Sequence, residues 1–241
     1  MPSAKDLKVD GANLKCIVVG KAGSGKSVFA SSFPTPGFLF DFDKGALTYR
    51  GLDFDYEQFE VTGRAWVDFE KKFKEVETQV REGKYTTVVF DSGSTLTDLA
   101  MERAMMLDPK RSPTGGPLWN VHFQMVRNLV EGRIQKLVNL PCNVVLTAHV
   151  NIITDQETGA VIDAQPMFTG QLSTKIPGLF DEVYFSLAKT EKGQTNFYLQ
   201  TVPKGMYAAR SRLSGQQRLL PDFVPNNYSA IMQLINKTQT K

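Results

Sequence analysis

One short glycine-rich stretch constrains the fold of this chain more than any other feature. Residues 20–27, GKAGSGKS, fit the phosphate-binding loop pattern G-x-x-x-x-G-K-[ST] at every fixed position. The apolar run Cys16-Ile17-Val18-Val19 precedes the loop, and Ser27-Val28-Phe29-Ala30 follows it. Because this loop joins a strand to a helix, its neighbours predict an α/β fold with a nucleotide bound at the end of the first strand.

The chemistry of the loop follows from its residue types. Glycines let successive backbone N–H groups converge on phosphate oxygens, and the start of the following helix adds a favourable dipole. We expect Lys26 to reach the β- and γ-phosphates of ATP, and the Ser27 hydroxyl to bind Mg²⁺. The residues expected to contact the nucleotide are Gly20, Lys21, Ala22, Gly23, Ser24, Gly25, Lys26 and Ser27.

Composition is that of an ordinary globular protein. The 241 residues are 41% hydrophobic and 22% charged, with a net charge of +3. We expect one α/β domain over residues 15–241 after an N-terminal arm, residues 1–14. Without a global excess of basic residues, nucleic-acid binding depends on local patches. Cys16 and Cys142 lie in apolar runs, and no run approaches membrane-spanning length, so we expect a reduced, cytoplasmic protein without membrane contact.

Apolar periodicity predicts alternating strands and helices. Strands are expected at about 15–19, 37–43, 85–91 and 143–150, followed by a strand pair at 181–187 and 196–201. Helices are expected just after the phosphate loop and at about 65–82, 95–106, 118–137 and within 221–237. Residues 107–117 are predicted to form a loop, and residues 151–178 a long loop or loose hairpin. This order predicts a mostly parallel central sheet with helices on both faces and an antiparallel C-terminal strand pair.

Polar residues stand at the carboxyl ends of these strands, where parallel sheets bind ligands. Asp91 ends the third strand and is expected to hold Mg²⁺ together with Ser27. No acid follows Asp91, so the group that activates water has to come from elsewhere, and Asp43 is the best candidate. Asp41 fits a structural turn cap better. His149 ends the fourth strand, where it either senses the γ-phosphate or serves the structure alone.

Four segments together resemble the RecA-like recombinase core, namely residues 20–27, Phe40-Asp41-Phe42-Asp43, Val88-Val89-Phe90-Asp91-Ser92 and Leu146-Thr147-Ala148-His149. The short first helix and the Thr-Ala-His ending are similar to the bacteriophage RecA-like ATPases of the Sak group, which anneal single strands. The resemblance covers about residues 15–215. It implies an ATPase that uses ATP and Mg²⁺, binds single-stranded DNA and promotes annealing or homologous recombination. It further implies a homo-oligomer, a filament or a ring, in the host cytoplasm if phage-encoded, with a single-strand-binding protein as a further candidate partner.

The resemblance also implies roles for individual residues. Asp43 takes the place of the catalytic acid, although these recombinases usually carry the longer glutamate there. His149 takes the place of an amide side chain that senses the γ-phosphate, and Tyr49 that of a tyrosine stacked on adenine. Arg210 or Arg212 would stabilise γ-phosphate charge in the site of a neighbouring subunit.

In the recombinases, the loops after the third and fourth strands contact DNA, which corresponds here to about residues 107–120 and 151–176. The first loop offers charge and a stacking surface, as single strands require. The second offers few cations. The candidate DNA-binding residues are Lys110, Arg111, Trp119 and Lys175.

Two other functions stay open. Lys21 resembles the extra lysine of deviant phosphate loops, and residues 39–43 also suit that group, so a dimeric partitioning or targeting ATPase switch is the main alternative. Against it, Pro34 shortens the first helix, and Ala22 departs from the usual glycine. A small-molecule kinase would need an acceptor pocket and an arginine-rich lid, and neither is evident in the sequence.

Overall fold

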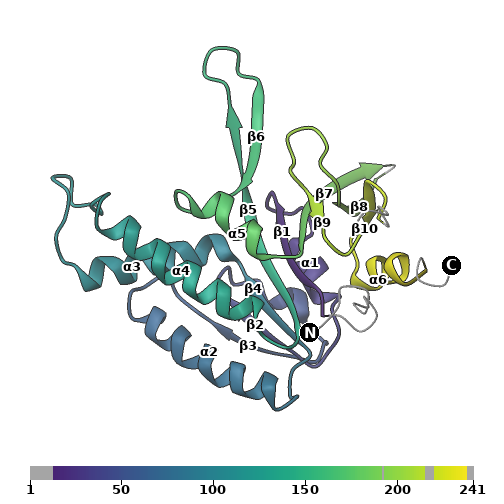
Figure 1. Cartoon of the computed structure of the whole chain (residues 1–241), viewed down its shortest axis with the longest axis horizontal. Coiled ribbons are helices and arrows are strands. Elements are labelled where there is room, and N and C mark those ends of the chain that lie inside the picture. Colours follow the sequence, from purple (N-terminus) through teal and green to yellow (C-terminus); the bar gives the residue numbers. More distant parts are fainter. Residues whose placement is uncertain (1–12, 192, 215–219, 238–241) are drawn as a thin grey trace, which may run out of the picture.

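The computed structural model describes residues 13–191, 193–214 and 220–237, and in them one twisted sheet lies between two groups of helices (Figure 1). The N-terminal arm predicted for residues 1–14 lies almost wholly outside these residues. The strands are β1 (Lys15–Gly20), β2 (Gly37–Asp41), β3 (Phe54–Gln58), β4 (Thr87–Asp91), β5 (Asn143–Thr154), β6 (Val161–Pro166), β7 (Glu182–Glu191), β8 (Gln194–Gln200), β9 (Arg210–Ser211) and β10 (Phe223–Pro225). The helices are α1 (Lys26–Ser31), α2 (Ala65–Arg81), α3 (Gly93–Leu107), α4 (His122–Val138), α5 (Leu172–Leu179) and α6 (Tyr228–Lys237), with a 3-10 helix, η2 (Ala46–Tyr49).

The sheet has the order β10-β8-β7-β1-β5-β4-β2-β3 among the described residues. The strands from β7 to β3 in this order run parallel to one another, whereas β8 and β10 continue the sheet antiparallel. The predicted fold class is therefore confirmed, including the antiparallel strand pair near the C-terminus. The carboxyl ends of β1, β2, β4 and β5 meet at one edge, which is where the predicted site residues stand.

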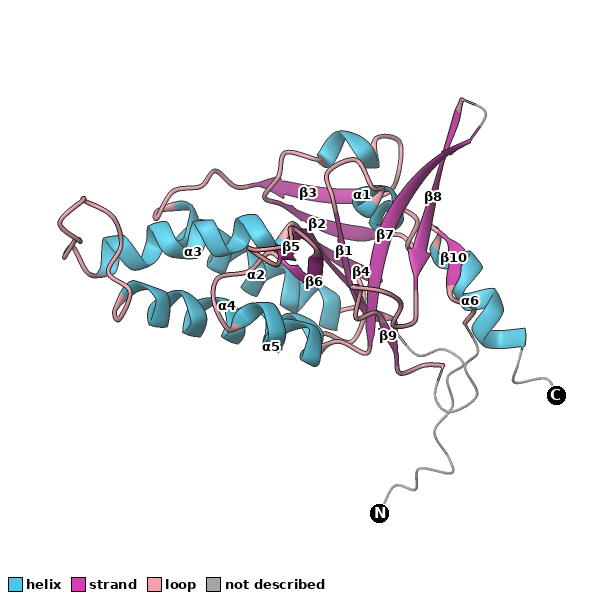
Figure 2. Cartoon of the chain, turned by 90° about the horizontal axis from the view of Figure 1, so that it is seen from above, coloured by secondary structure: helices cyan, strands magenta, loops and turns pink. Residues whose placement is uncertain are grey.

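Two apolar clusters cover the two faces of the sheet, and Figure 2 shows helices on either side of it. Side chains alternate along each strand, so that Ile17 and Val19 of β1 join one cluster while Cys16 and Val18 join the other. Helices α2, α3, α4 and α5 pack on the first face, and α1 and α6 on the second. This alternation explains why the strands read as continuous apolar runs, since both faces are buried.

The region 151–178, predicted as a loop or loose hairpin, is more regular than its composition suggests. Strand β5 continues to Thr154 and pairs antiparallel with β6, so the two form a hairpin arm that projects from the body (Figure 1). Helix α5 follows the arm. It has eight residues and contains Pro177, so its apolar period is too short to recognise in the sequence. The arm and α5 place residues 169–171 beside α4, and the sequence did not indicate that these segments are neighbours.

Candidate nucleotide-binding site

The phosphate loop folds as its motif predicts, between β1 and α1. Gly23 and Gly25 have φ angles of 74° and 95°, in the left-handed region that favours glycine. Lys26 Nζ donates to the carbonyl oxygens of Gly20 and Lys21, at 3.1 Å and 3.0 Å. Burial lowers the pKa of this lysine, and the nearby carboxylates of Asp91 and Asp43 oppose the shift. The ammonium group therefore lies across the loop, close to where phosphates would bind.

The loop presents unused backbone donors. In the described part of the chain, the N–H groups of Gly23, Gly25 and Lys26 donate to no protein acceptor. Gly25 and Lys26 are buried, and buried backbone N–H groups are usually paired, so unpaired ones suit an anionic ligand. The geometry fits the phosphates of a nucleotide, as the motif predicts.

The predicted magnesium ligands lie side by side. Ser27 Oγ donates to Asp91 Oδ2 at 2.6 Å, and Thr147 Oγ1 donates to the other carboxylate oxygen. Burial raises the pKa of Asp91, while the hydrogen bonds from Ser27 and Thr147 lower it, and the net shift is upward. Mg²⁺ commonly takes one or two protein oxygens and completes its shell with phosphate oxygens and water. The Ser27–Asp91 pair fits that donor set, and the described residues contain no cluster of three or more His, Cys, Asp or Glu that would hold a metal on its own.

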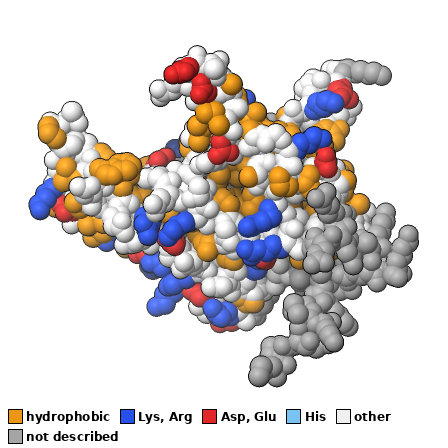
Figure 3. All heavy atoms as spheres, turned by 45° about the horizontal axis from the view of Figure 1, so that its top comes forward, with side chains coloured by type: hydrophobic (Ala, Val, Ile, Leu, Met, Phe, Trp, Pro, Cys, Tyr) orange, Lys and Arg blue, Asp and Glu red, His pale blue; other side chains and the backbone are white. Residues whose placement is uncertain are grey.

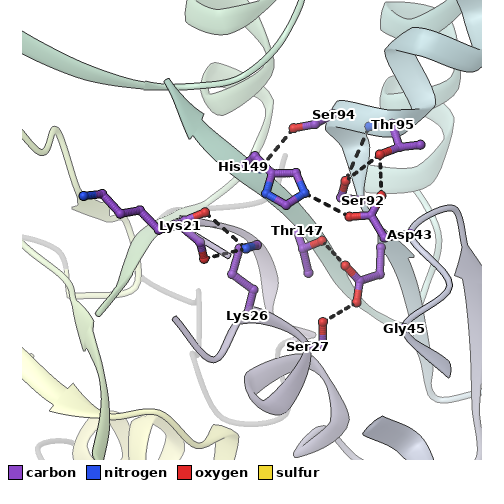
Figure 4. A network of polar contacts seen from close by, with 12 residues as sticks. Lys21, Lys26, Ser27, Asp43, Gly45, Ser92, Ser94, Thr95, Thr147 and His149 are labelled. Atoms are coloured by element: carbon purple, nitrogen blue, oxygen red, sulfur yellow. Dashed lines mark hydrogen bonds and ion pairs between the residues drawn. The ribbon is translucent and has the colours of Figure 1, made fainter. Parts of the chain in front are cut away.

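The predicted catalytic acid and the predicted sensor are in direct contact. His149 Nε2 lies 3.1 Å from Asp43 Oδ2, and Thr95 Oγ1 donates to Asp43 Oδ1 (Figure 4). Burial raises the pKa of Asp43, but hydrogen bonds from His149, Thr95 and Ser92 outweigh it and lower the pKa below its usual range. The backbone N–H of His149 donates to Ser94 Oγ at 3.0 Å. An ionised carboxylate is thus held at the end of the sheet beside the phosphate loop.

Asp41 has the structural role that its position suggested. Its carboxylate accepts hydrogen bonds from the N–H groups of Gly45 and Ala46, at 2.8 Å and 3.1 Å, and from Gln58 Nε2 at 2.9 Å. The side chain is fully buried. Asp41 therefore fixes the turn into η2 and the end of β3, and leaves Asp43 as the acid that faces the loop.

Tyr49 does not occupy the position that the resemblance implied. Its side chain is only 5% exposed and belongs to the apolar cluster beneath α1, with its ring edge-on to Phe54 at 5.0 Å. Burial raises the pKa of its hydroxyl well above the usual range. A ring that packs in the core has no free face for a base, so adenine stacking on Tyr49 is corrected to a packing role. The prediction went wrong because chain distance alone located the residue.

Arg210 and Arg212 lie away from the phosphate loop of their own chain. Strand β9 pairs with the start of β7, whereas the loop follows the carboxyl end of the parallel strand β1. Arg210 Nη2 donates to the carbonyls of Pro177 and Phe180, and Arg212 forms an ion pair with Asp181 at 3.1 Å. Both arginines therefore stabilise the end of α5 in this chain.

The candidate DNA-binding residues are brought together only in part. Trp119 is 69% exposed and its ring lies 4.4 Å from that of Phe123. These rings and Arg127 line a hollow of about 360 Å³ that is closed on its other side by residues 169–171. Lys110 is exposed, but it does not line this hollow. The cation that lines it is Arg127, which is not among the candidate residues from the sequence. The four-residue spacing of Phe123 and Arg127, which places both on one face of α4, was an available signal.

The other two candidate cations have partners within the chain. The Arg111 guanidinium donates to the carbonyls of Met105, Asp108 and Lys110, where α3 ends. Lys175 forms an ion pair with Glu131 of α4 at 3.3 Å. Such exposed pairs are weak, so Lys175 is still able to exchange partners.

His122, fully buried at the start of α4, closes the loop that carries Trp119. Its Nδ1 accepts from the N–H of Leu118 at 2.7 Å, and its Nε2 lies 2.9 Å from the carbonyl oxygen of Asp108. This arrangement suits a neutral imidazole with its proton on Nε2. The histidine thereby ties both ends of the loop to one helix, a role that the sequence did not reveal.

The β5–β6 arm carries negative charge, which disfavours binding of DNA phosphates. Residues 150–170 contain Asp155, Glu157 and Asp163 and neither Lys nor Arg. Acidic side chains stand at the tip of the arm, above apolar ones (Figure 3). DNA affinity comes largely from cations that neutralise phosphates, so this charge counts against the predicted second DNA loop. Any contact with DNA has to rest on the first loop and on residues 167–176.

Comparison with known proteins places the chain in a family. The model of the AAA domain family AAA_24 matches residues 12–213. The comparison with curated proteins gives no match. Among solved structures, a KaiC-like protein from the hyperthermophilic archaeon Pyrococcus horikoshii is similar, with 13% sequence identity and a TM-score of 0.47 over 90% of this chain and 87% of that chain. No described helix is long and apolar enough to cross a membrane. The family match spans most of the chain and includes the phosphate loop and both strand-end carboxylates, so the chain belongs to the AAA domain family and has a P-loop ATPase fold.

Proposed function

We propose that this protein is a Mg²⁺-dependent ATPase that binds single-stranded DNA and promotes annealing or homologous recombination. The observation that carries the ATPase part is the contact between Asp43 and His149 beside the Ser27–Asp91 pair. This contact places a carboxylate that would activate water, and a group that would sense the γ-phosphate, beside the loop that would bind the nucleotide. The DNA part rests on the RecA-like resemblance and on the hollow beside Trp119.

Hydrolysis requires a group that accepts a proton from the attacking water. The lowered pKa of Asp43 keeps its carboxylate ionised at neutral pH, as a general base requires. Lys26 would exchange its two carbonyl partners for phosphate oxygens and stabilise the charge that develops there. Mg²⁺, held by Ser27 and Asp91, would neutralise further phosphate charge. A γ-phosphate that accepts a hydrogen bond from His149 would compete with Asp43 for the imidazole. Loss of the γ-phosphate on hydrolysis would therefore change the contacts of His149, which lies in β5 where the β5–β6 arm begins.

Single-stranded DNA would bind at the hollow beside α4. Bases stack on exposed aromatic rings, and each stacked base contributes about 1–3 kcal/mol. Trp119 and Phe123 offer such rings, and Arg127 offers a guanidinium group within the same hollow. His122 holds the loop in place from beneath, which reduces the entropy lost on binding.

A homo-oligomer, ring or filament, would complete the ATP site. Arg210 and Arg212 lie at the start of β7, far from the phosphate loop of their own chain, as a residue that acts on a neighbour's nucleotide requires. The side chain of Arg212 is 50% exposed, and its only carboxylate partner in the described residues is Asp181. Contact with a γ-phosphate would replace this weak pair with a stronger charge-assisted one.

The test is the ATPase rate with and without single-stranded DNA, measured beside the particle mass from light scattering. We expect DNA to raise the rate and nucleotide to favour large particles, and we expect Lys26→Ala to abolish turnover. Absence of single-stranded DNA binding with ADP, ATP or a non-hydrolysable analogue present would refute the DNA part. Absence of turnover in the wild type under all these conditions would refute the ATPase part.

The partitioning switch makes a different prediction for Lys21, an exposed residue of the phosphate loop. In a deviant phosphate loop this lysine would act on the nucleotide of a dimeric partner. Lys21→Ala would then abolish hydrolysis, whereas an unchanged rate favours the recombinase function.

A further inference from the structure

Two residues far away in sequence hold the backbone of the phosphate loop. Asn226 Nδ2 donates to the carbonyl oxygen of Gly25 at 2.8 Å, and Ser186 Oγ donates to that of Ser24 at 2.5 Å. Ser186 belongs to β7, and Asn226 directly follows β10. Both side chains are buried, with 2% and 9% of their surface exposed. The loop is thus fastened from beneath by two separate segments of the chain.

The orientation of the Asn226 amide follows from its surroundings. Its backbone N–H donates to the carbonyl oxygen of Phe197 at 3.2 Å, which ties the residue to β8. The Nδ2 group has to face Gly25, because turning the amide over would bring two oxygen acceptors together. Its Oδ1 is buried without a hydrogen-bond partner in the described residues. A buried oxygen without a hydrogen-bond partner lowers the stability of the fold. We therefore attribute the position of this side chain to the hydrogen bond that its Nδ2 donates to the loop.

The contact also depends on glycine at the acceptor. A Cβ atom at position 25 would lie 2.7 Å from Asn226 Nδ2 and 2.8 Å from the ring of Phe197. The Gly25 carbonyl accepts from Phe29 N as well, at 2.9 Å, in the first turn of α1. Asn226 therefore approaches the loop at a point that only glycine leaves open, and adds a second bond to a carbonyl that begins a helix.

The geometry of the peptide bond connects these carbonyls to the nucleotide. In a trans peptide, the C=O of one residue and the N–H of the next point in opposite directions. Holding the Ser24 carbonyl therefore directs the N–H of Gly25 away from Ser186, and holding the Gly25 carbonyl directs the N–H of Lys26 away from Asn226. These two N–H groups are among those that donate to no acceptor in the described part of the chain.

We propose that Asn226, assisted by Ser186, is a positioning residue for nucleotide phosphates. By holding loop carbonyls on the far side, it keeps the N–H groups of Gly25 and Lys26 aimed at the phosphate oxygens before the ligand arrives. The inference rests on the proposed ATP site, but not on DNA binding. It also gives a function to the segment 223–237, which lies beyond the family match at residues 12–213.

Asn226→Asp tests the proposal, because it keeps the shape of the side chain and replaces the donor with an acceptor. Asn226→Ala is measured beside it, because it removes the donor without adding a negative charge near the phosphates. We expect the dissociation constants of Mg²⁺-ADP and of a non-hydrolysable Mg²⁺-ATP analogue, measured by calorimetry, to rise about tenfold or more. Ser186→Ala should raise both in the same direction by a smaller factor. Asn227→Ala is the matched control. Asn227 Oδ1 accepts from Ser229 N and Oγ at the start of α6, and the described contacts of that side chain do not include the loop.

Thermal unfolding without nucleotide separates positioning from general stability. The proposal expects Asn226→Asp to lose affinity at temperatures where its far-UV circular dichroism matches the wild type, and Asn227→Ala to lose stability with affinity unchanged within about twofold. Equal affinities for wild type and Asn226→Ala would overturn it, as would equal losses in Asn226→Asp and Asn227→Ala. If Asn226→Asp does not fold, Asn226→Ala and Ser186→Ala decide by the same criteria. A wild type that binds neither nucleotide would instead refute the proposed ATP site.

Discussion

His149 Nε2 lies 3.1 Å from Asp43 Oδ2, although 106 positions separate the two residues in the chain. The pair joins the segment after β2 to β5, whose continuation is the projecting arm. Thr95 at the start of α3 holds the other oxygen of the same carboxylate. One carboxylate thus connects three elements beside the phosphate loop, and the first two predictions concern it.

Asp43→Asn should separate binding from hydrolysis. The amide keeps the size of the side chain but accepts no proton, so we expect the ATPase kcat to fall by about 10²- to 10⁴-fold, the usual contribution of a general base. Affinity for Mg²⁺-ATP should change little, because the loop and Ser27 are untouched. Steady-state kinetics and calorimetry measure both quantities, with the exposed Asp53→Asn as control. A kcat within about twofold of the wild type would exclude Asp43 as the base.

His149→Ala should move the pH dependence of hydrolysis. Hydrogen bonds from His149 and Thr95 lower the pKa of Asp43, so removing one of them raises that pKa. A larger fraction of Asp43 is then protonated at acidic pH, and the acidic limb of the kcat profile should shift to higher pH. Thr95→Val should shift it the same way, because Thr95 donates to the other carboxylate oxygen. An acidic limb that stays in place in both variants would contradict this role.

Trp119→Ala should weaken the binding of single-stranded DNA. Losing one stacking surface costs about 1–3 kcal/mol, or roughly 5- to 150-fold in affinity. Fluorescence anisotropy with a labelled oligonucleotide measures the effect, and the ATPase rate without DNA should not change. Tyr56→Ala, which removes a 58% exposed aromatic ring from β3, is the matched control. Equal affinities for wild type and Trp119→Ala would place the DNA elsewhere.

Shortening the β5–β6 arm should leave DNA affinity intact. Thr154 and Val161 pair across the hairpin, so Asn-Gly in place of residues 155–160 closes it with a two-residue turn. The change removes Asp155 and Glu157, which repel phosphate, and we expect affinity in the same anisotropy assay to stay within about twofold or to increase at low salt. A marked loss of DNA affinity would instead indicate that the arm contacts DNA.

Glu182→Gln should remove a pH dependence of stability. The Glu182 side chain is fully buried, and burial raises its pKa above the ordinary 4.5 despite hydrogen bonds from Leu213 N and Tyr184. As pH rises above 4.5, the unfolded chain loses this proton first, so the folded state holds more protons and the free energy of unfolding falls until the folded pKa is passed. Glutamine has no such proton. Urea unfolding between about pH 4 and 7 should show this fall in the wild type only, and parallel curves would contradict it.

Local patterns determined much of this protein from the sequence alone. The phosphate loop, its flanking strand and helix, and the acids at strand ends were all readable, because each depends on residues within a few positions of one another. The parallel sheet followed from the alternation of strands and helices. Asp91 beside Ser27 and the structural role of Asp41 were predicted because the carboxyl ends of parallel strands meet at one edge.

The tertiary structure decided which distant residues meet. Sequence position suggested that Tyr49 would face a base, but packing placed its ring in the core. The contact of His149 with Asp43 and that of Asn226 with Gly25 join positions more than a hundred residues apart, and no periodicity predicts such pairs. The physical reason is that these contacts depend on strand order and on how helices pack across the sheet. The sequence by itself therefore determined that a phosphate loop exists. Only the packing of the whole chain decided which distant side chains hold the backbone of the loop and which charged groups lie beside it.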